Sequence, residues 1–168
     1  MIHIYTGNGK GKTTAALGLG LRAIGASKKV LLIQFLKDGQ SSEIKGIKKL
    51  PNFDTKAFGR KGFLNKNKLT KKDFDPARRG FLFAKKAIQS KKYNLIILDE
   101  INIVINLGLL KIEEVIDLIK KAPLKTELIL TGRNANKKLI QSADLVTEMK
   151  EIKHYYKKGV KARKGIEF

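Results

Sequence analysis

The sequence contains no cysteine, which excludes disulfide bonds and thiolate metal sites. Its two histidines, His3 and His154, lie far apart and do not have the spacing of metal ligands. No apolar run is long enough to cross a membrane. The first strand-like run begins at Ile2, which leaves no room for a signal peptide. We therefore expect a cytoplasmic protein that does not act at a membrane.

Acidic and aromatic residues are also few. The chain has 15 Asp and Glu against 36 Lys and Arg, a formal net charge of +21. Such a charge suits nucleic acid, an anionic membrane surface or anionic small molecules as partners. However, only six of the basic residues are arginine and only 7% of residues are aromatic, whereas base recognition favours arginine forks and aromatic stacking. Nucleic acid is therefore not the expected partner, and we interpret the dispersed lysines as a surface bias.

The chain has 168 residues, of which 42% are apolar, enough for one domain with a full core and too few for two. Strand-like runs at 2–6, 30–36, 53–58, 95–99, 128–131 and 145–149 alternate with helical patterns at 12–24, 74–90, 112–121 and 136–143. This alternation predicts an α/β fold in which a mostly parallel central sheet is covered by helices on both faces. Ligands bind such sheets at the carboxyl ends of the strands.

A glycine-rich run follows the first predicted strand directly. Residues 6–14 read Thr-Gly-Asn-Gly-Lys-Gly-Lys-Thr-Thr, and a turn of this kind that opens a helix is the phosphate-binding P-loop. Backbone N–H groups would bind phosphates, Lys12 would add a point charge, and the Thr13 hydroxyl could bind magnesium. Thr6 stands where the consensus has glycine. A turn that merely connects strand and helix is the alternative, but the small, apolar helix pattern that follows favours nucleotide binding. The predicted phosphate-binding residues are Thr6, Gly7, Asn8, Gly9, Lys10, Gly11, Lys12, Thr13 and Thr14.

A second motif occupies residues 94–100, Asn-Leu-Ile-Ile-Leu-Asp-Glu. An apolar strand that ends in acidic residues is the Walker B pattern, which places a carboxylate beside the metal held by the P-loop threonine. Asp99 would hold magnesium directly or through water. Glu100 would be a second magnesium contact or, in a hydrolase, the base that orients a water molecule. Such strands also occur for structural reasons, but together with a P-loop this one predicts a magnesium site formed by Thr13, Asp99 and Glu100.

Two further segments are open to more than one interpretation. Arg133 follows a strand-like run at the edge where phosphates should lie, so it could contact a phosphate through two N–H groups or cap the next helix. The irregular stretch 59–72 is either a mobile lid or an ordinary surface loop.

In their order along the chain, these motifs resemble the P-loop ATP:corrinoid adenosyltransferases of cobalamin synthesis and salvage. The resemblance rests on residues 5–16, 34–37, 98–100 and 131–135, and on the carboxyl-terminal stretches 143–149, 153–154 and 159–167. It spans nearly the whole chain. The combination of the variant P-loop with the carboxyl-terminal run is more specific than the P-loop alone.

The resemblance implies one P-loop NTPase domain over residues 1–168, with a RecA-like fold. It implies an enzyme that transfers the 5′-deoxyadenosyl group of ATP to the Co(I) of a corrinoid and releases tripolyphosphate. Because the corrinoid is the nucleophile, no nucleophilic side chain is needed. The implied cofactors and partners are ATP, Mg²⁺ or Mn²⁺, the corrinoid, an electron donor such as a flavoprotein, and a second copy of the chain in a homodimer.

The resemblance also implies roles for individual residues by matching position. Lys12 and Glu100 would be catalytic, and the metal would be served by Thr13, Asp99 and Glu100. Weaker matches assign Lys37 and Arg133 to ATP, and Glu43 and Phe63 to the corrinoid. In the family, apolar side chains on a loop beneath the corrin remove the lower axial ligand of cobalt, and Phe63 is the match on that loop. The chain starts at the first strand, without the helix that covers the site in some relatives. We therefore expect the lid or a dimer partner to close the site.

From the residues alone, two other functions remain open. One is a small ATPase or kinase of unknown acceptor, which would produce ADP with Glu100 as base. The other is a nucleic-acid-binding module that uses ATP as a switch and binds in a salt-sensitive manner. The even spread of lysines and the carboxyl-terminal run argue against the module.

Overall fold

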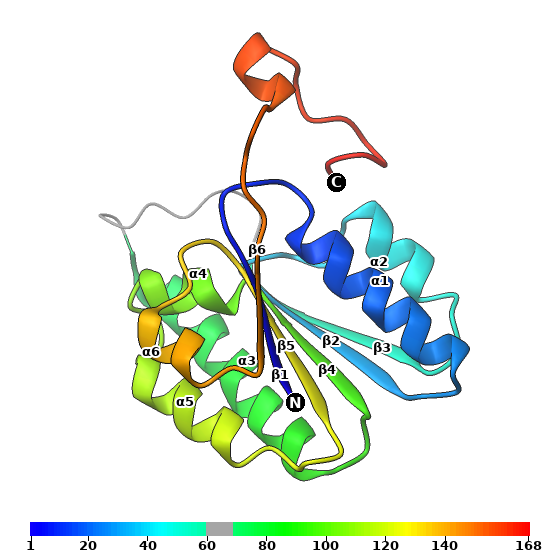
Figure 1. Ribbon diagram of the computed structural model, residues 1–168, viewed down its shortest axis with the longest axis vertical. Helices are drawn as coiled ribbons and strands as arrows, with labels where there is room; N and C mark the ends of the chain where they lie inside the picture. The colour runs from blue at the N-terminus through cyan, green and yellow to red at the C-terminus, as the bar shows by residue number, and fades with distance from the viewer. Residues whose placement is uncertain (60–68) are drawn as a thin grey trace.

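The computed structural model describes residues 1–59 and 69–168. Within these residues one sheet is formed by β1 (Ile2–Thr6), β2 (Val30–Phe35), β3 (Phe53–Phe58), β4 (Leu95–Asp99), β5 (Glu127–Thr131) and β6 (Leu145–Glu148). The strand order is β3-β2-β4-β5-β1-β6, and every neighbouring pair is parallel. All strands therefore end at the same edge (Figure 1). β5 separates the P-loop strand β1 from the acidic strand β4, so the predicted RecA-like α/β fold is confirmed.

Helices cover both faces of the sheet (Figure 1). α1 (Lys12–Gly25) and α2 (Ser42–Ile47) pack on one face. The other face carries α3 (Lys71–Gln89), α4 (Ile101–Asn106), α5 (Ile112–Lys120) and α6 (Lys137–Gln141). A short 3-10 helix, η2 (Tyr155–Lys158), lies in the carboxyl-terminal tail, which extends beyond the sheet above the P-loop. No helix among the described residues is both long and apolar enough to cross a membrane.

The central strands divide their side chains between two cores. In β2, Leu31, Ile33 and Phe35 pack with α3, α4 and α5, whereas Val30 and Leu32 pack with α1 and α2. Successive side chains of a strand point to opposite faces, so a strand covered on both faces is apolar throughout. Every residue of β2 and β4 is buried, as this arrangement requires.

One glycine sets the distance between α1 and the sheet. A Cβ atom on Gly20 would lie 2.7 Å from the ring of Phe53, so no larger residue fits without moving that ring. The close approach fixes the helix that carries the P-loop lysine and threonines.

The predicted strands and helices are all present, with boundaries shifted by a few residues. α3 begins at Lys71 because Thr70 and Asp73 form a capping box, with Thr70 N–H donating to Asp73 Oδ2 at 2.9 Å. Lys71 and Lys72 therefore belong to a helix and not to the lid predicted over 59–72, and residues 60–68 of that segment lie outside the described residues. The helices α2, α4 and η2 were not predicted: each spans fewer than two turns, and none was recognised from its pattern, unlike the equally short α6.

Candidate active site

The P-loop lies at the carboxyl edge of the sheet, between β1 and α1. Gly11 is the N-cap of α1, with φ of 118°, and Gly7 has φ of 94°; both values fall in the region that favours glycine. Because glycine brings no capping side chain, the N–H groups of the first turn of α1 can face an anion. Lys12 Nζ donates to the carbonyl oxygen of Gly9 at 2.7 Å, which places the ammonium over the loop. Burial and the charge of Arg133 lower the pKa of Lys12 below its ordinary value.

Asp99 is completely buried beneath this loop and accepts four side-chain hydrogen bonds. The hydroxyls of Thr13 and Thr131 donate to Oδ1, at 2.8 and 2.7 Å. Gln34 Nε2 and Lys37 Nζ donate to Oδ2, at 3.2 and 2.7 Å. Groups from α1, β2, β5 and the segment after β2 thus fix both carboxylate oxygens.

The Asp99–Lys37 contact is an ion pair of a buried acid with a partly exposed base. Burial by itself raises the pKa of Asp99, but the Lys37 ammonium and the hydrogen bonds from the two threonines outweigh it, so the pKa lies below its usual value. For Lys37, burial lowers the pKa, and the carboxylates of Asp99 and Glu100 more than offset this, so that the pKa is raised. Both residues are therefore charged at neutral pH.

Glu100, the residue after Asp99, has a backbone conformation that residues other than glycine rarely adopt. Its φ is 66°, and its N–H donates to Thr131 Oγ1 at 3.0 Å. Burial and the neighbouring Asp99 carboxylate raise the pKa of Glu100. Backbone strain of this kind is found at functional sites, where the surrounding structure maintains it. Here it accompanies a side chain that lines the cleft described below.

Three oxygen-bearing groups predicted to serve magnesium surround one point. The ammonium nitrogen of Lys37 occupies that point: Nζ lies 3.3 Å from Thr13 Oγ1, 2.7 Å from Asp99 Oδ2 and 3.8 Å from Glu100 Oε1. Carboxylate and hydroxyl oxygens are the ligands that Mg²⁺ and Mn²⁺ prefer, and Mg²⁺ usually adds substrate phosphates and water to one or two carboxylates. Among the residues that the structure describes, no group of three or more His, Cys, Asp or Glu could hold a metal. Thr13, Asp99 and Glu100 supply hydroxyl and carboxylate oxygens of the kind that a magnesium ion carrying phosphate ligands would accept.

A cleft of about 1430 Å³ opens above these groups. Thr6 is not part of its wall, because its hydroxyl accepts the Ala135 N–H at 3.1 Å and the residue is buried. Phe63 lies outside the described residues. The site residues predicted from the sequence that line the cleft are Asn8, Gly9, Lys10, Gly11, Lys12, Thr13, Thr14, Lys37, Glu43, Glu100 and Arg133.

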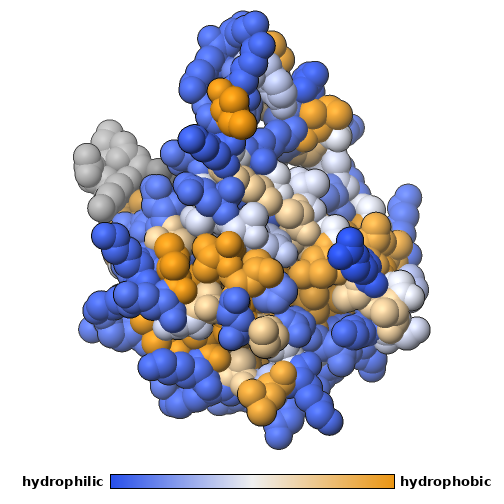
Figure 2. All heavy atoms as spheres, in the orientation of Figure 1, coloured by the Kyte–Doolittle hydropathy of each residue, from blue (hydrophilic) through white to orange (hydrophobic). Residues whose placement is uncertain are grey.

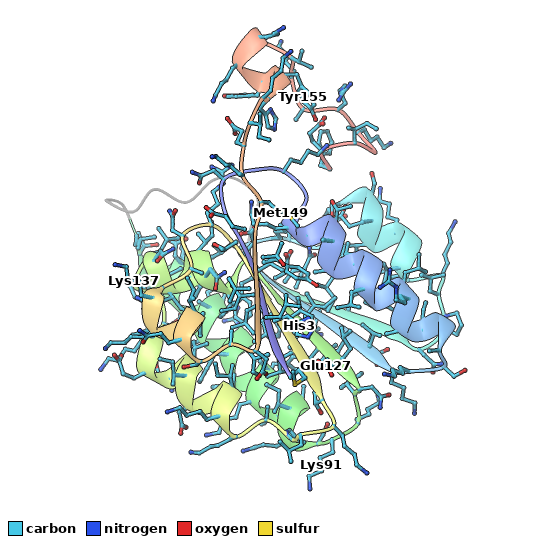
Figure 3. The ribbon with its side chains drawn as sticks, in the orientation of Figure 1. His3, Lys91, Glu127, Lys137, Met149 and Tyr155 are labelled. Atoms are coloured by element: carbon cyan, nitrogen blue, oxygen red, sulfur yellow. The ribbon has the colours of Figure 1, made fainter. Side chains whose placement is uncertain are left out.

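The carboxyl-terminal tail forms one wall of the cleft. The carbonyl of Met149 accepts the Gly9 N–H at 2.6 Å, and Lys10 Nζ donates to Glu167 Oε1 at 3.0 Å and to the Tyr155 hydroxyl at 3.2 Å. Figure 3 shows Met149 beside the P-loop and Tyr155 further out in the tail. Lys10 thus points toward the tail in this structure. The terminal run contributed to the family resemblance, but none of its residues was among the predicted site residues.

Two asparagines of α4 hold the loop that carries Arg133. Asn102 Nδ2 donates to the Gly132 carbonyl at 3.1 Å, and Asn106 Nδ2 donates to the carbonyls of Arg133 and Asn134 at 3.1 and 2.8 Å. Their signal in the sequence is the pair of polar residues within the apolar run 101–106.

The two histidines do not contribute to a common site. His3 Nε2 pairs with Glu127 Oε2 at 3.2 Å near the opposite edge of the sheet, as Figure 3 shows. His154 lies in the tail and caps η2 by accepting the Tyr156 N–H at 3.1 Å.

Comparison with known proteins assigns the family. A family model described as ATP:corrinoid adenosyltransferase BtuR/CobO/CobP matches residues 1–168. A corrinoid adenosyltransferase of Pseudomonas aeruginosa is 34% identical over 98% of this chain and 82% of its own length, and that of Escherichia coli K12 is 31% identical over 100% and 85%. An uncharacterized Nostoc protein is 42% identical over 91% of this chain, which spans 44% of that protein. Because the family model matches the whole length of the sequence, the chain belongs to the ATP:corrinoid adenosyltransferase family.

Proposed function

We propose that the protein transfers the 5′-deoxyadenosyl group of ATP to the Co(I) of a corrinoid and releases tripolyphosphate. The observation that supports this most is that the phosphate-binding and acidic groups converge on one cleft in a chain that matches the family along its whole length. At about 1430 Å³ the cleft exceeds the roughly 300–1,000 Å³ of most small-molecule pockets, which suits two substrates.

The proposed reaction forms one bond and breaks one. The electron pair of Co(I) attacks the ribose C5′ of ATP and forms a Co–C bond, which leaves cobalt formally as Co(III). The bond between C5′ and the triphosphate oxygen breaks, and the oxygen keeps its electrons. The protein's tasks are to align the two substrates and to stabilise the departing polyanion.

The described residues fit these two tasks. The N-terminus of α1 would bind phosphate oxygens, and the charges of Lys12 and Arg133, which act on one another, would stabilise the leaving tripolyphosphate. We propose that Thr13, Asp99 and Glu100 hold a magnesium ion, which would neutralise phosphate charge. Glu43, in the first turn of α2, faces the cleft and is proposed for the corrinoid; Phe63 remains a prediction for the same substrate.

The transfer can be followed with ATP that carries ¹³C at C5′. The protein would be incubated anaerobically with labelled ATP, Mg²⁺ and a chemically reduced Co(I) corrinoid. The expected ¹³C resonance is that of a carbon bonded to cobalt, and it should disappear on exposure to light. Label that stays on an unmodified nucleotide while ATP is consumed would favour the ATPase or kinase.

We further propose that the protein is a homodimer, that a one-electron donor such as a flavoprotein supplies Co(I), and that the reaction takes place in the cytoplasm. The dimer is supported by β6, which ends the sheet and has all of its residues exposed, including Leu145 and Val146. Figure 2 shows apolar residues gathered on the face where β6 lies. Exposed edge strands readily pair with another chain.

Light scattering would test the dimer. A dimeric mass is expected, and Val146→Lys should shift it toward the monomer, whereas Lys91→Ala, in the turn before β4, should not. A monomeric wild-type protein would contradict the proposal.

A further inference from the structure

The ammonium of Lys37 occupies the position between the side chains that are proposed to bind the metal ion. Its distances to Thr13 Oγ1, Asp99 Oδ2 and Glu100 Oε1 are 3.3, 2.7 and 3.8 Å. These are the three groups proposed as metal ligands, and no divalent cation can bind all three while the ammonium stays between them.

The backbone around Lys37 is built to bring the ammonium to this point. Leu36, the preceding residue, has φ of 62°, which turns the chain sharply at the end of β2. A Cβ atom on Gly59 would lie 2.3 Å from the Lys37 backbone nitrogen, so glycine is needed for the close approach of these two segments. The side chain keeps 32% exposure and reaches the cleft, so a ligand in the cleft can contact it.

The charges of the site disfavour a free divalent cation. Three basic groups act electrostatically on the Glu100 carboxylate, and one of them, Lys37, also pairs with Asp99. The basic groups are Lys12, Lys37 and Arg133. The Lys37 ammonium repels a free metal ion at this point, whereas a metal–triphosphate complex, whose net charge is negative, is attracted by the basic groups around it.

We propose that Lys37 is an internal cation that makes metal binding conditional on nucleotide: a metal–triphosphate complex displaces its ammonium, and a free metal ion does not. The proposal rests on the metal ligands named in the proposed function. Once displaced, the ammonium would remain beside the triphosphate, since lysine has a flexible four-carbon stem. The metal and ATP therefore enter together.

Binding of Mn²⁺ alone to the full-length, nucleotide-free protein tests this inference. The free ion is measured by electron paramagnetic resonance, for the wild type and for Lys37→Met, Lys37→Gln and Lys37→Arg. Removal of the charge in the Met and Gln variants should tighten Mn²⁺ binding by about tenfold or more, while the Arg variant stays as weak as the wild type. The double variant Lys37→Gln with Asp99→Asn should lose the gain, which would place the bound ion at this site.

A second measurement covers the case in which Lys37→Met fails to fold because Asp99 is left buried without a positive partner. Mn²⁺ should raise the melting temperature of Lys37→Gln, whose amide can still donate to Asp99, more than that of the wild type. Equal Mn²⁺ affinities and equal thermal shifts in the wild type and Lys37→Gln would overturn the inference, as would a gain that survives loss of the Asp99 charge.

The inference and the proposed function fail in different experiments. If the wild type adenosylates a corrinoid but Lys37→Gln binds free Mn²⁺ no better, the function stands and the inference is wrong. If Lys37→Gln gains Mn²⁺ affinity through Asp99 but the wild type yields ADP, the inference holds for a different reaction.

Discussion

Thr131 connects the two acidic residues of the site. Its buried hydroxyl donates to Asp99 Oδ1 at 2.7 Å and accepts the Glu100 N–H at 3.0 Å. Thr131→Val keeps the shape but leaves these partners unsatisfied, so we expect a loss of about 1–3 kcal/mol in the free energy of unfolding, measured with urea. Thr131→Ser should recover most of it, and a Val variant as stable as the wild type would contradict this role.

Glu100 is expected to lower the stability of the fold while serving the proposed metal site. Because burial and Asp99 raise its pKa, ionising Glu100 costs the folded state more than the unfolded chain, so the stability present at low pH is lost as pH rises through the raised pKa. Glu100→Gln removes this effect and should stabilise the protein by roughly 1 kcal/mol at about pH 7, with little gain near pH 4.

Urea unfolding at the two pH values measures this gain, and turnover at several Mg²⁺ concentrations measures the functional loss. A gain that is equal at both pH values would show that the charge of Glu100 is not the cause. Turnover with unchanged Mg²⁺ dependence would remove Glu100 from the metal site.

Lys12 is expected to be indispensable for turnover. Lys12→Ala removes the charge over the P-loop and should reduce ATP-dependent turnover by about a hundredfold or more, the usual effect of losing one electrostatic contact to a transition state. Lys91→Ala, at the opposite edge of the sheet, is the matched control and should keep wild-type turnover. Near-normal turnover of Lys12→Ala would refute the P-loop assignment.

At this scale the sequence predicts residues within motifs better than contacts between them. Asp99 could be placed beside Thr13 because the two motifs end on parallel strands of one sheet. Gln34 and Thr131 could not be assigned to Asp99, since their contacts depend on the register of β2 and β5 against β4. The Lys10–Glu167 pair was also beyond prediction, because it joins residues from opposite ends of the chain.

At the scale of the elements, the P-loop and the carboxyl-terminal tail pack closely against each other. A Cβ atom on Gly7 would lie 2.4 Å from the Met149 carbonyl oxygen, and Gly7 has positive φ, so Gly7→Ala should destabilise the protein by about 1–3 kcal/mol through strain and the clash. Gly18→Ala, within α1 and with open space around it, should instead stabilise by about 0.5–1 kcal/mol. Thermal unfolding of the two variants measures both effects, and equal losses would refute the close packing.

Whether the tail is released is a separate measurement. Hydrogen exchange of the amides after Met149 should become faster in Gly7→Ala and remain unchanged in Gly18→Ala. Unchanged exchange in both variants would mean that the tail does not depend on its contact with the P-loop.

Long elements were predictable from apolar patterns, whereas of the short helices only α6 was predicted, as the longer segment 136–143. The strands follow from runs that are buried on both faces, as in β2 and β4. α2 and α4 have six residues each, fewer than two helical turns, so no period can be read from them. The true start of α3 depends on the Thr70–Asp73 capping box, a signal that the apolar pattern alone does not carry.

For the whole molecule, the family resemblance predicted the function better than the composition did. The family assignment is confirmed, whereas the net charge of +21 alone left several classes of partner open. Part of the positive charge has a local use: Lys12, Lys37 and Arg133 surround the acidic pair at the cleft. Composition could not show this, because 36 basic residues are spread over the chain; it was the P-loop motif and the family resemblance that assigned these three residues to ATP.

The leaving group tests the central claim most directly. After anaerobic incubation of the protein with ATP, Mg²⁺ and a Co(I) corrinoid, phosphorus NMR distinguishes inorganic tripolyphosphate from ADP and phosphate. The account predicts tripolyphosphate in amounts equal to the adenosylated corrinoid, and neither product with Lys12→Ala. ADP and phosphate with an unmodified corrinoid would contradict it.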